Sequence, residues 1–319
     1  MKFDVITVGS AVIDSFLETE LEEEHGKIYF PIGTKILVKE LWFSTGGGGT
    51  NTAASFSTLG LKTGYIGKLG KDENANIILN ELKKFKVSFL GSQGTTPTGY
   101  STIIDSKKLH RTVLTYKGAN DSLAINELKL KNLNTHWFYF SAMLNNSLKT
   151  QEKLALISKK INLKIAYNPS SYLTRKGPNL IKNIIKYTNI LVLNNEEAEH
   201  LVGKNPLLIT FKKLHSLGPE IICITYGEKG NKASDKKNIF ISKPHNIKPK
   251  ERTGAGDAFA SGFVTGVIYH NNIEKAIQFG SLNAESVIQI PGAKNGLLTK
   301  SQIEKQMKTN PVKIEVKKF

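Results

Sequence analysis

Short apolar runs alternate with helical patterns along most of the 319-residue chain. The apolar runs are rich in β-branched and aromatic residues, as buried strands are, and lie at 5–8, 65–66, 137–140, 164–167, 190–193 and 221–225. Helical spacing of apolar or small residues occurs between them, at 52–59, 75–85, 151–161, 180–187 and 258–268. This alternation predicts an α/β fold with a central, mostly parallel sheet that helices flank on both faces.

Two segments, 15–44 and 98–116, interrupt the alternation. The first contains KILVKELWFS, which alternates as an exposed strand does, and the second predicts a hairpin of half-buried strands around a polar turn at Asp105–His110. No linker or low-complexity block divides the chain, so we expect a single domain over 1–319 with these segments inserted as a small β-sheet lid. The alternative is an extra hairpin that packs on the main sheet.

Composition excludes several classes of protein. With 39% hydrophobic residues, the chain can bury a full core, unlike a disordered tail or a disulfide-stapled miniprotein. No apolar run approaches the roughly 20 residues that span a bilayer, and the N-terminal residues do not read as a secretory signal. The single cysteine, Cys223, lies in an apolar run, which fits a buried thiol and a cytoplasmic location.

The net charge of +17 raises the question of a polyanionic partner. Only Arg111, Arg175 and Arg252 are arginines, although arginine is the better residue for forked phosphate contacts. The lysines are spread along the chain rather than gathered in one segment. We therefore expect a solvated surface and no nucleic-acid partner, with a basic pocket for a phosphorylated substrate as an alternative.

The strongest signal for chemistry is TGAGDAFASG at 253–262. Small residues there precede a helical pattern, and the first N–H groups of a helix have no partner within it, so they can bind an anion. Asp257 would repel a phosphate at this point unless it accepts a proton from an attacking hydroxyl group. The alternative is that Asp257 caps the N-terminus of an ordinary helix.

A second glycine-rich segment, Gly46–Asn51, also precedes small residues in a helical pattern. Four consecutive glycines favour a backbone that touches a polar ligand, with a flexible loop as the alternative. Asn51 can both donate to and accept from a sugar hydroxyl. Neither segment fits a P-loop or a dinucleotide fingerprint, and the seven histidines lack metal-ligand spacing, so we expect no zinc site.

Together with several other motifs, these two segments resemble the ribokinase (PfkB) family of sugar and nucleoside kinases over essentially the whole chain. The motifs occur in family order: the opening strand with Gly9 and Asp14, GGGGTN, IGKLGKD at 66–72, KGAN at 117–120, LNNEEAEHLVG at 193–203, TYGEKG at 225–230, TGAGDAF and NAESVIQIPGA at 283–293. The resemblance implies a Rossmann-like ribokinase fold with a β-sheet lid. It also implies ATP-dependent phosphorylation of a hydroxymethyl group of a sugar or of a nucleoside ribose.

The resemblance implies roles for particular residues. Asp257 matches the catalytic base, and the backbone of Gly254, Ala255 and Gly256 matches the anion hole. The positions that contact the sugar match Asp14, Gly47, Gly48 and Asn51. The positions that bind the nucleotide match Thr225, Gly227, Asn283, Gly292 and Ala293. The pair that orients hydrated Mg²⁺ beside the phosphates of MgATP matches Asn194 and Glu197.

One departure from the family pattern concerns a cation. Where the family often has Asp-Thr before GAGD, this chain has Glu251 and Arg252. The Asp in many members helps to hold a monovalent cation, so a requirement for potassium is left open here.

The acceptor and the oligomeric state also stay open. GGGG before Thr-Asn occurs in kinases of phosphorylated sugars too, and cations lie in or beside the expected lid at Lys35, Lys39, Arg111 and Lys117. A phosphofructokinase-like enzyme is therefore one alternative, and a non-catalytic sugar- or nucleotide-binding regulator is another. Apolar lid residues such as Leu41 and Trp42 suggest that two lids pair in a homodimer.

Overall fold

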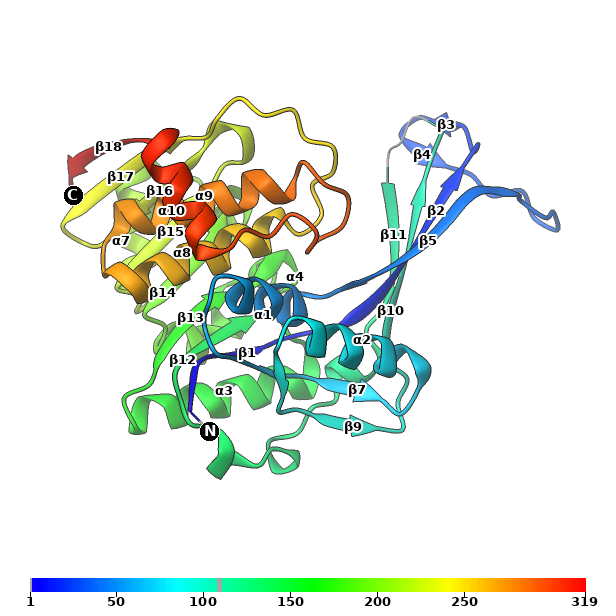
Figure 1. Ribbon diagram of the computed structural model, residues 1–319, viewed down its shortest axis with the longest axis horizontal. Helices are drawn as coiled ribbons and strands as arrows, with labels where there is room; N and C mark the ends of the chain where they lie inside the picture. Colours follow the sequence, from blue (N-terminus) through cyan, green and yellow to red (C-terminus); the bar gives the residue numbers. More distant parts are fainter. Residues whose placement is uncertain (1, 108–110) are drawn as a thin grey trace.

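The computed structural model describes residues 2–107 and 111–319 (Figure 1). The predicted turn at Asp105–His110 extends to residues 108–110, which lie outside the described residues. Among the described residues, a large sheet carries ten strands in the order β18-β17-β16-β15-β14-β13-β12-β1-β6-β8. The strands from β15 to β8 are parallel, and β16, β17 and β18 extend one edge antiparallel. The predicted α/β fold with a mostly parallel central sheet is confirmed.

Each predicted apolar run lies in a strand of this sheet. The strands are β1 (Phe3–Val8), β6 (Thr63–Ile66), β8 (Ser88–Phe89), β12 (Thr135–Ser141), β13 (Lys164–Asn168), β14 (Ile190–Asn194), β15 (Ile221–Thr225), β16 (Asn231–Ser234), β17 (Asn238–Lys243) and β18 (Lys313–Lys318). Alternate residues of β12 belong to two separate apolar clusters. Phe138 and Phe140 lie in one cluster, and Trp137 and Tyr139 lie in the other. Both faces of the sheet are therefore buried, which explains why its strands are continuous apolar runs.

Helices cover both faces of the large sheet. One cluster contains residues of α3 (Asn145–Lys160), α4 (Ser170–Thr174), α5 (Lys182–Ile185), α6 (Asn195–Val202) and α7 (Leu207–Ser216). The other contains residues of α1 (Gly48–Thr58), α8 (Ala255–His270) and α9 (Ile273–Val287). Helix α10 (Lys300–Thr309) packs on α9, and α2 (Glu73–Lys84) packs beside α1 and β2. No helix among the described residues is long and apolar enough to cross a membrane.

The remaining elements are short. They are β3 (Glu23–Glu24), β4 (Lys27–Ile28), β7 (Lys68–Gly70), β9 (Ser92–Gly94) and the 3₁₀ helices η1 (Gly118–Asp121), η2 (Ile125–Glu127), η3 (Leu130–Asn132), η4 (Pro178–Leu180) and η5 (Gly227–Lys229).

A second, smaller sheet extends to one side of the body (Figure 1). Its strands, in the order β11-β10-β2-β5, are β11 (Arg111–Tyr116), β10 (Gly99–Asp105), β2 (Val12–Thr19) and β5 (Val38–Gly46). We call it the small sheet. The predicted strand at 112–116 is present as β11, but its predicted half-burial was wrong, because β11 is an edge strand whose residues are all exposed.

The chain passes directly from the large sheet into the small sheet. Only residues 9–11 separate β1 from β2. Asn120 holds this junction, since its Nδ2 donates to the carbonyl of Ala11 and its Oδ1 accepts from the N–H of Ala11, both at 2.8 Å. Asn120 is buried, so the bonds are shielded from water.

Candidate active site

The order of the strands creates a switch point between β1 and β12. From β1 the chain adds β6 and β8 on one side, and later β12 to β15 on the other. Ligands of open α/β sheets bind outside the carboxyl ends of the strands at such a point. The neighbouring strands end there in polar residues, which are Ser141, Asn168, Asn194 and Thr225.

The segment Gly46–Asn51 lies against this switch point. A Cβ atom added to Gly49 would lie 2.6 Å from the carbonyl carbon of Gly9, just after β1, so only glycine permits this approach. Helix α1 begins at Gly48. The segment is therefore the start of a helix on the sheet edge rather than a flexible loop.

Asp257 and Asn51 bring the two glycine-rich segments together. Nδ2 of Asn51 donates to Oδ2 of Asp257 at 2.8 Å. Helix α8 is capped by Gly254, and Asp257 makes no capping bond, so the alternative role as a helix cap does not hold. Burial raises the pKa of Asp257, although the bond from Asn51 and the charge of Lys294 act in the opposite direction.

Free N–H groups lie beside this carboxylate. The N–H of Ala255 donates to the carbonyl of Arg252 at 3.3 Å, and that of Ala258 to Gly254 at 2.8 Å. In the described part of the chain, the N–H groups of Gly256 and Asp257 have no acceptor. The positive end of α8 can therefore bind an anion next to Asp257.

Asp14, on β2, belongs to the same site. The strand register places it between Ser44 of β5 and Ser101 of β10. Burial raises the pKa of Asp14, whereas a hydrogen bond from Ser101 and the charge of Lys294 lower it. Because Lys294 acts on both Asp14 and Asp257, the two carboxylates share one electrostatic environment.

Lys294 is a site residue that the sequence analysis missed. It is buried, and its Nζ donates to the carbonyl of Thr45 at 2.9 Å, to Oγ1 of Thr45 at 2.5 Å and to Oε2 of Glu81 at 2.6 Å. Burial lowers the pKa of Lys294, and the charge of Glu81 opposes this. With all three of its protons donated, Lys294 holds β5, α2 and the loop after α9 together.

The residues expected at the nucleotide lie along the sheet edge, with one exception. Thr225 is the register partner of Asn194, and Gly227 follows in an exposed turn. Gly292 and Ala293 lie beside the start of α8, since a Cβ on Gly254 would lie 2.6 Å from Cα of Ala293. This approach requires glycine at 254, where φ is 80°.

Asn283 is the exception, because the structure does not bring it to the surface. It is fully buried beneath α8. Its Nδ2 donates to Ser55 at 3.0 Å and to the carbonyl of Ala258 at 2.9 Å, and its Oδ1 accepts from the N–H of Leu298 at 3.0 Å. These bonds make it a support for α1 and α8.

Asn194 and Glu197 bind each other in a capping box at the start of α6. Oδ1 of Asn194 accepts from the N–H of Glu197 at 2.8 Å, and Oε2 of Glu197 accepts from the N–H of Asn194 at 2.9 Å. Burial raises the pKa of Glu197, against the hydrogen bonds that it accepts. No group of three or more ligating residues that could hold a metal occurs within 2–107 and 111–319. The donors fit a hydrated Mg²⁺ held mainly by phosphates, not a protein cage.

Several buried polar atoms near Asp257 have no partner within the described residues. They are Oδ1 of Asn51, Oγ of Ser141 and the hydroxyl of Tyr139. Buried polar atoms are nearly always hydrogen-bonded, so these atoms leave unused hydrogen-bonding capacity near Asp257. Burial raises the pKa of Tyr139 well above its ordinary value, and the charges of Asp257 and Glu197 add to this. Tyr139 thus lies within the field of both carboxylates.

The fold is an open α/β sheet with a carboxylate and free helix N–H groups at its switch point. The pfkB family of carbohydrate kinases matches residues 2–300, so the chain belongs to that family. Members of this family are ATP-dependent sugar kinases, and the predicted family is confirmed.

The relatives of the chain include kinases whose names state different phosphoryl acceptors. The chain is 26% identical to a ribokinase of Haemophilus influenzae over 267 residues, which cover 81% of this chain and 85% of that protein. It is 25% identical to an ATP-dependent 6-phosphofructokinase of Thermoanaerobacterium thermosaccharolyticum over 291 residues, 88% of this chain and 86% of that protein. The family is therefore clear, while the acceptor is not fixed by these relatives.

Solved structures confirm the ribokinase fold. The ribokinase of Arabidopsis thaliana, complexed with ribose and ATP, superposes with a TM-score of 0.82 at 20% identity, covering 97% of this chain and 99% of that one. A nucleoside kinase of Methanocaldococcus jannaschii superposes with a TM-score of 0.77 at 21% identity and the same coverage.

Proposed function

We propose that this protein transfers the γ-phosphoryl group of MgATP to a hydroxymethyl group of a free sugar or of a nucleoside ribose. The observation that carries the proposal is the carboxylate of Asp257, held by Asn51 beside the free N–H groups of α8. Asp257 accepts the hydroxyl proton as the acceptor attacks. Within the expected anion hole at Gly254, Ala255 and Gly256, the N–H of Ala255 is bonded to Arg252, so the free N–H groups of Gly256 and Asp257 stabilise the charge on the moving phosphoryl group. Each such donor contributes about 10²–10³ in rate.

The other residues position the two substrates. Asp14 accepts hydrogen bonds from acceptor hydroxyls, with Gly47, Gly48 and Asn51 on the other side of the acceptor. Thr225, Gly227, Gly292 and Ala293 surround the nucleotide. Asn194 and Glu197 would hold the waters of a bound Mg²⁺, and the metal would neutralise charge on the phosphates. We propose a cytoplasmic location, where ATP is available.

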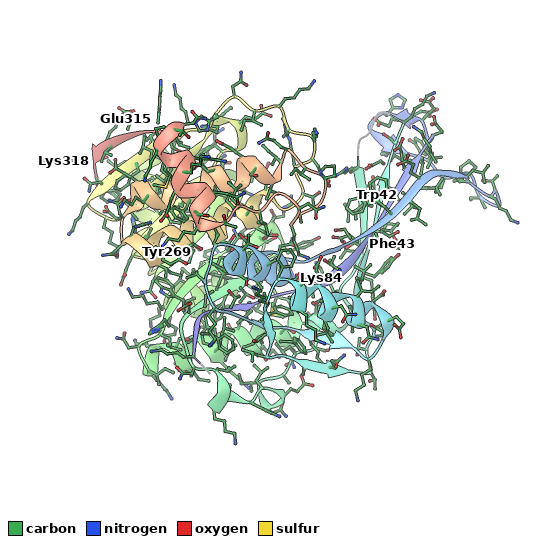
Figure 2. The ribbon with its side chains drawn as sticks, in the orientation of Figure 1. Trp42, Phe43, Lys84, Tyr269, Glu315 and Lys318 are labelled. Atoms are coloured by element: carbon green, nitrogen blue, oxygen red, sulfur yellow. The ribbon has the colours of Figure 1, made fainter. Side chains whose placement is uncertain are left out.

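We propose that the small sheet is the lid of this site within one domain. Residues 14 and 16 of β2 share its inner face, whereas the register places Leu41, Phe43, Leu114 and Tyr116 on the opposite face. These four outer side chains are between 52% and 61% exposed. Figure 2 shows Phe43 on the small sheet, apart from the body of the molecule. Such a patch supports pairing with a second copy of the chain.

A substrate panel tests the proposed reaction. ADP release is measured with MgATP and ribose, fructose, adenosine, cytidine, fructose 6-phosphate or tagatose 6-phosphate. We expect turnover with an unphosphorylated sugar or a nucleoside and its loss in Asp257→Asn. ATP binding without ADP release from any acceptor would instead indicate a regulator.

Lys117 favours a second candidate, a kinase of phosphorylated sugars. Lys39 is paired with Glu18 at 2.6 Å, so its charge is matched. Lys117 instead contacts the ring of Tyr172, with Nζ 4.4 Å from the ring centre, and its charge acts on Asp14. A phosphate ester on the acceptor could pair with it. Turnover confined to the two phosphate esters would establish this candidate.

A further inference from the structure

Arg111 joins the small sheet to the loop that leads into α8. Its Nε donates to Oδ1 of Asp105 at 2.9 Å, and Asp105 is its partner in the register of β10 and β11. Its Nη1 donates to Oε1 of Glu251 at 3.0 Å and lies 3.5 Å from Oγ1 of Thr253. One guanidinium group thus bridges two carboxylates from distant parts of the chain.

The small sheet holds this guanidinium in a fixed orientation. Cζ of Arg111 lies 5.8 Å from the ring centre of Phe16, which itself stacks on Trp42 at 5.2 Å with 4° between the ring planes. The side chain of Asp105 is 5% exposed, so its bond to Arg111 is shielded. A planar fork that is fixed at one arm presents the other arm at a defined place.

Glu251 connects Arg111 to the residues that pack against the start of α8. Its side chain is 9% exposed, and its Oε2 accepts from the N–H of Gly292 at 2.8 Å. Burial alone would raise the pKa of Glu251, but bonds from Thr253, Gly292 and Arg111 hold it below its ordinary value. Gly292 precedes Ala293, which packs against Gly254.

The other arginine near Glu251, Arg252, pairs with a different carboxylate. Arg252 is 74% exposed and pairs with Glu228 at 2.5 Å. An ionised, buried Glu251 needs a cation, because an unpaired buried charge is strongly unfavourable. In this structure the small sheet supplies that cation.

We infer that Arg111 is a positioning residue that holds Glu251 and Thr253, and thereby orders the free N–H groups of Gly256 and Asp257. Arg111 and Asp14 lie on the same face of the small sheet. Resting on the proposed function, the consequence is that the sheet that binds the acceptor also orders the phosphate-binding backbone.

Amide hydrogen exchange on the full chain tests this inference without any acceptor. In Arg111→Met we expect exchange in peptides covering 251–257 and 290–294 to accelerate about tenfold, as for loss of a charged hydrogen bond. Peptides of β14 and β15 should keep their wild-type rates. Affinity for a non-hydrolysable ATP analogue with Mg²⁺, measured by calorimetry, should weaken together with the faster exchange. Wild-type exchange at 251–257 in Arg111→Met would overturn the inference.

Three further variants separate the bridge from general effects. Arg252→Met is the matched control and should behave as wild type. Arg111→Lys has a single nitrogen in place of the fork, so we expect it to exchange as Arg111→Met does, and wild-type behaviour would refute the two-armed bridge. Adding Arg111→Met to Glu251→Gln should change little, whereas additive effects would show that Arg111 does not act through Glu251. Lack of turnover in the wild type would defeat the proposed function but leave these exchange results interpretable.

Discussion

Asn51 and Asp257 are 206 residues apart in the chain and joined by one hydrogen bond of 2.8 Å in the fold. The bond links the starts of α1 and α8, which bring the two glycine-rich segments to the same point of the sheet edge. It also occupies one oxygen of Asp257 with a donor that stabilises the ionised form. The carboxylate is therefore held in one orientation before any ligand binds.

Replacing Asp257 by Asn should lower kcat by about 10²–10⁴, because the acceptor loses its general base. The variant should not be less stable at neutral pH. A carboxyl group with a raised folded-state pKa lowers stability at pH values above its ordinary pKa, and the neutral amide removes that cost. Kinetics and thermal unfolding measure the two effects, with Glu304→Gln on α10 as a control. Near-normal turnover would remove Asp257 from its role.

The acidic limb of the pH profile should depend on Asn51. Because burial raises the pKa of Asp257, kcat/KM should fall with decreasing pH at a midpoint above that of an ordinary carboxyl group. Asn51→Leu removes a bond to the charged form, so the midpoint should rise by about one pH unit. An identical midpoint in both proteins would show that the limb reports another group.

Lys294→Met should destabilise the fold. It leaves Glu81 and Thr45 without their shared donor, and breaking a largely buried pair costs about 3 kcal/mol. Urea unfolding measures this, with Lys317→Met as the control, since the side chain of Lys317 is 56% exposed and pairs with the exposed Glu315 at 3.2 Å. A loss no larger than that of the control would mean that the three elements are held by packing alone.

The outer face of the small sheet should mediate self-association. The wild type should sediment as a dimer, and the Phe43→Lys/Leu114→Lys double variant as a monomer with an unchanged melting temperature. Both side chains are exposed, at 61% and 59%, so charge there costs little in the single chain. Leu156→Lys, on α3 and 46% exposed, is the matched control. A monomeric wild type at working concentrations would argue against this interface.

The fold was predictable because its signals are local. Apolar runs identify the strands of the large sheet, since each is buried on both faces and reads as apolar without reference to its neighbours. The small sheet was harder. Its edge strand β11 alternates in sequence as a half-buried strand does, yet no helix covers it, and coverage is a property of the assembled fold.

The site was predictable only in part. GGGGTN and TGAGD stand out by composition, and the structure joins them through Asn51 and Asp257. Lys294 and Arg111 do not stand out, because they are two of 44 cationic residues and their partners lie far away in sequence. Asn283 shows the reverse case, since a residue in a recognisable motif turns inward to support α8.

The bonds of Asn120 to Ala11 and of Lys294 to Thr45 both fix the base of the small sheet. A rotation of the sheet about this base would displace each residue in proportion to its distance from the base. At about 3.3 Å per residue, Asp14 lies roughly 10 Å along β2 from Ala11, and Glu18, which is level with Asp105 and Arg111 in the register, lies roughly 23 Å from it. Such a rotation would move the end of the small sheet that carries Arg111 more than twice as far as Asp14, so the bond of Arg111 to Glu251 is the contact most sensitive to it.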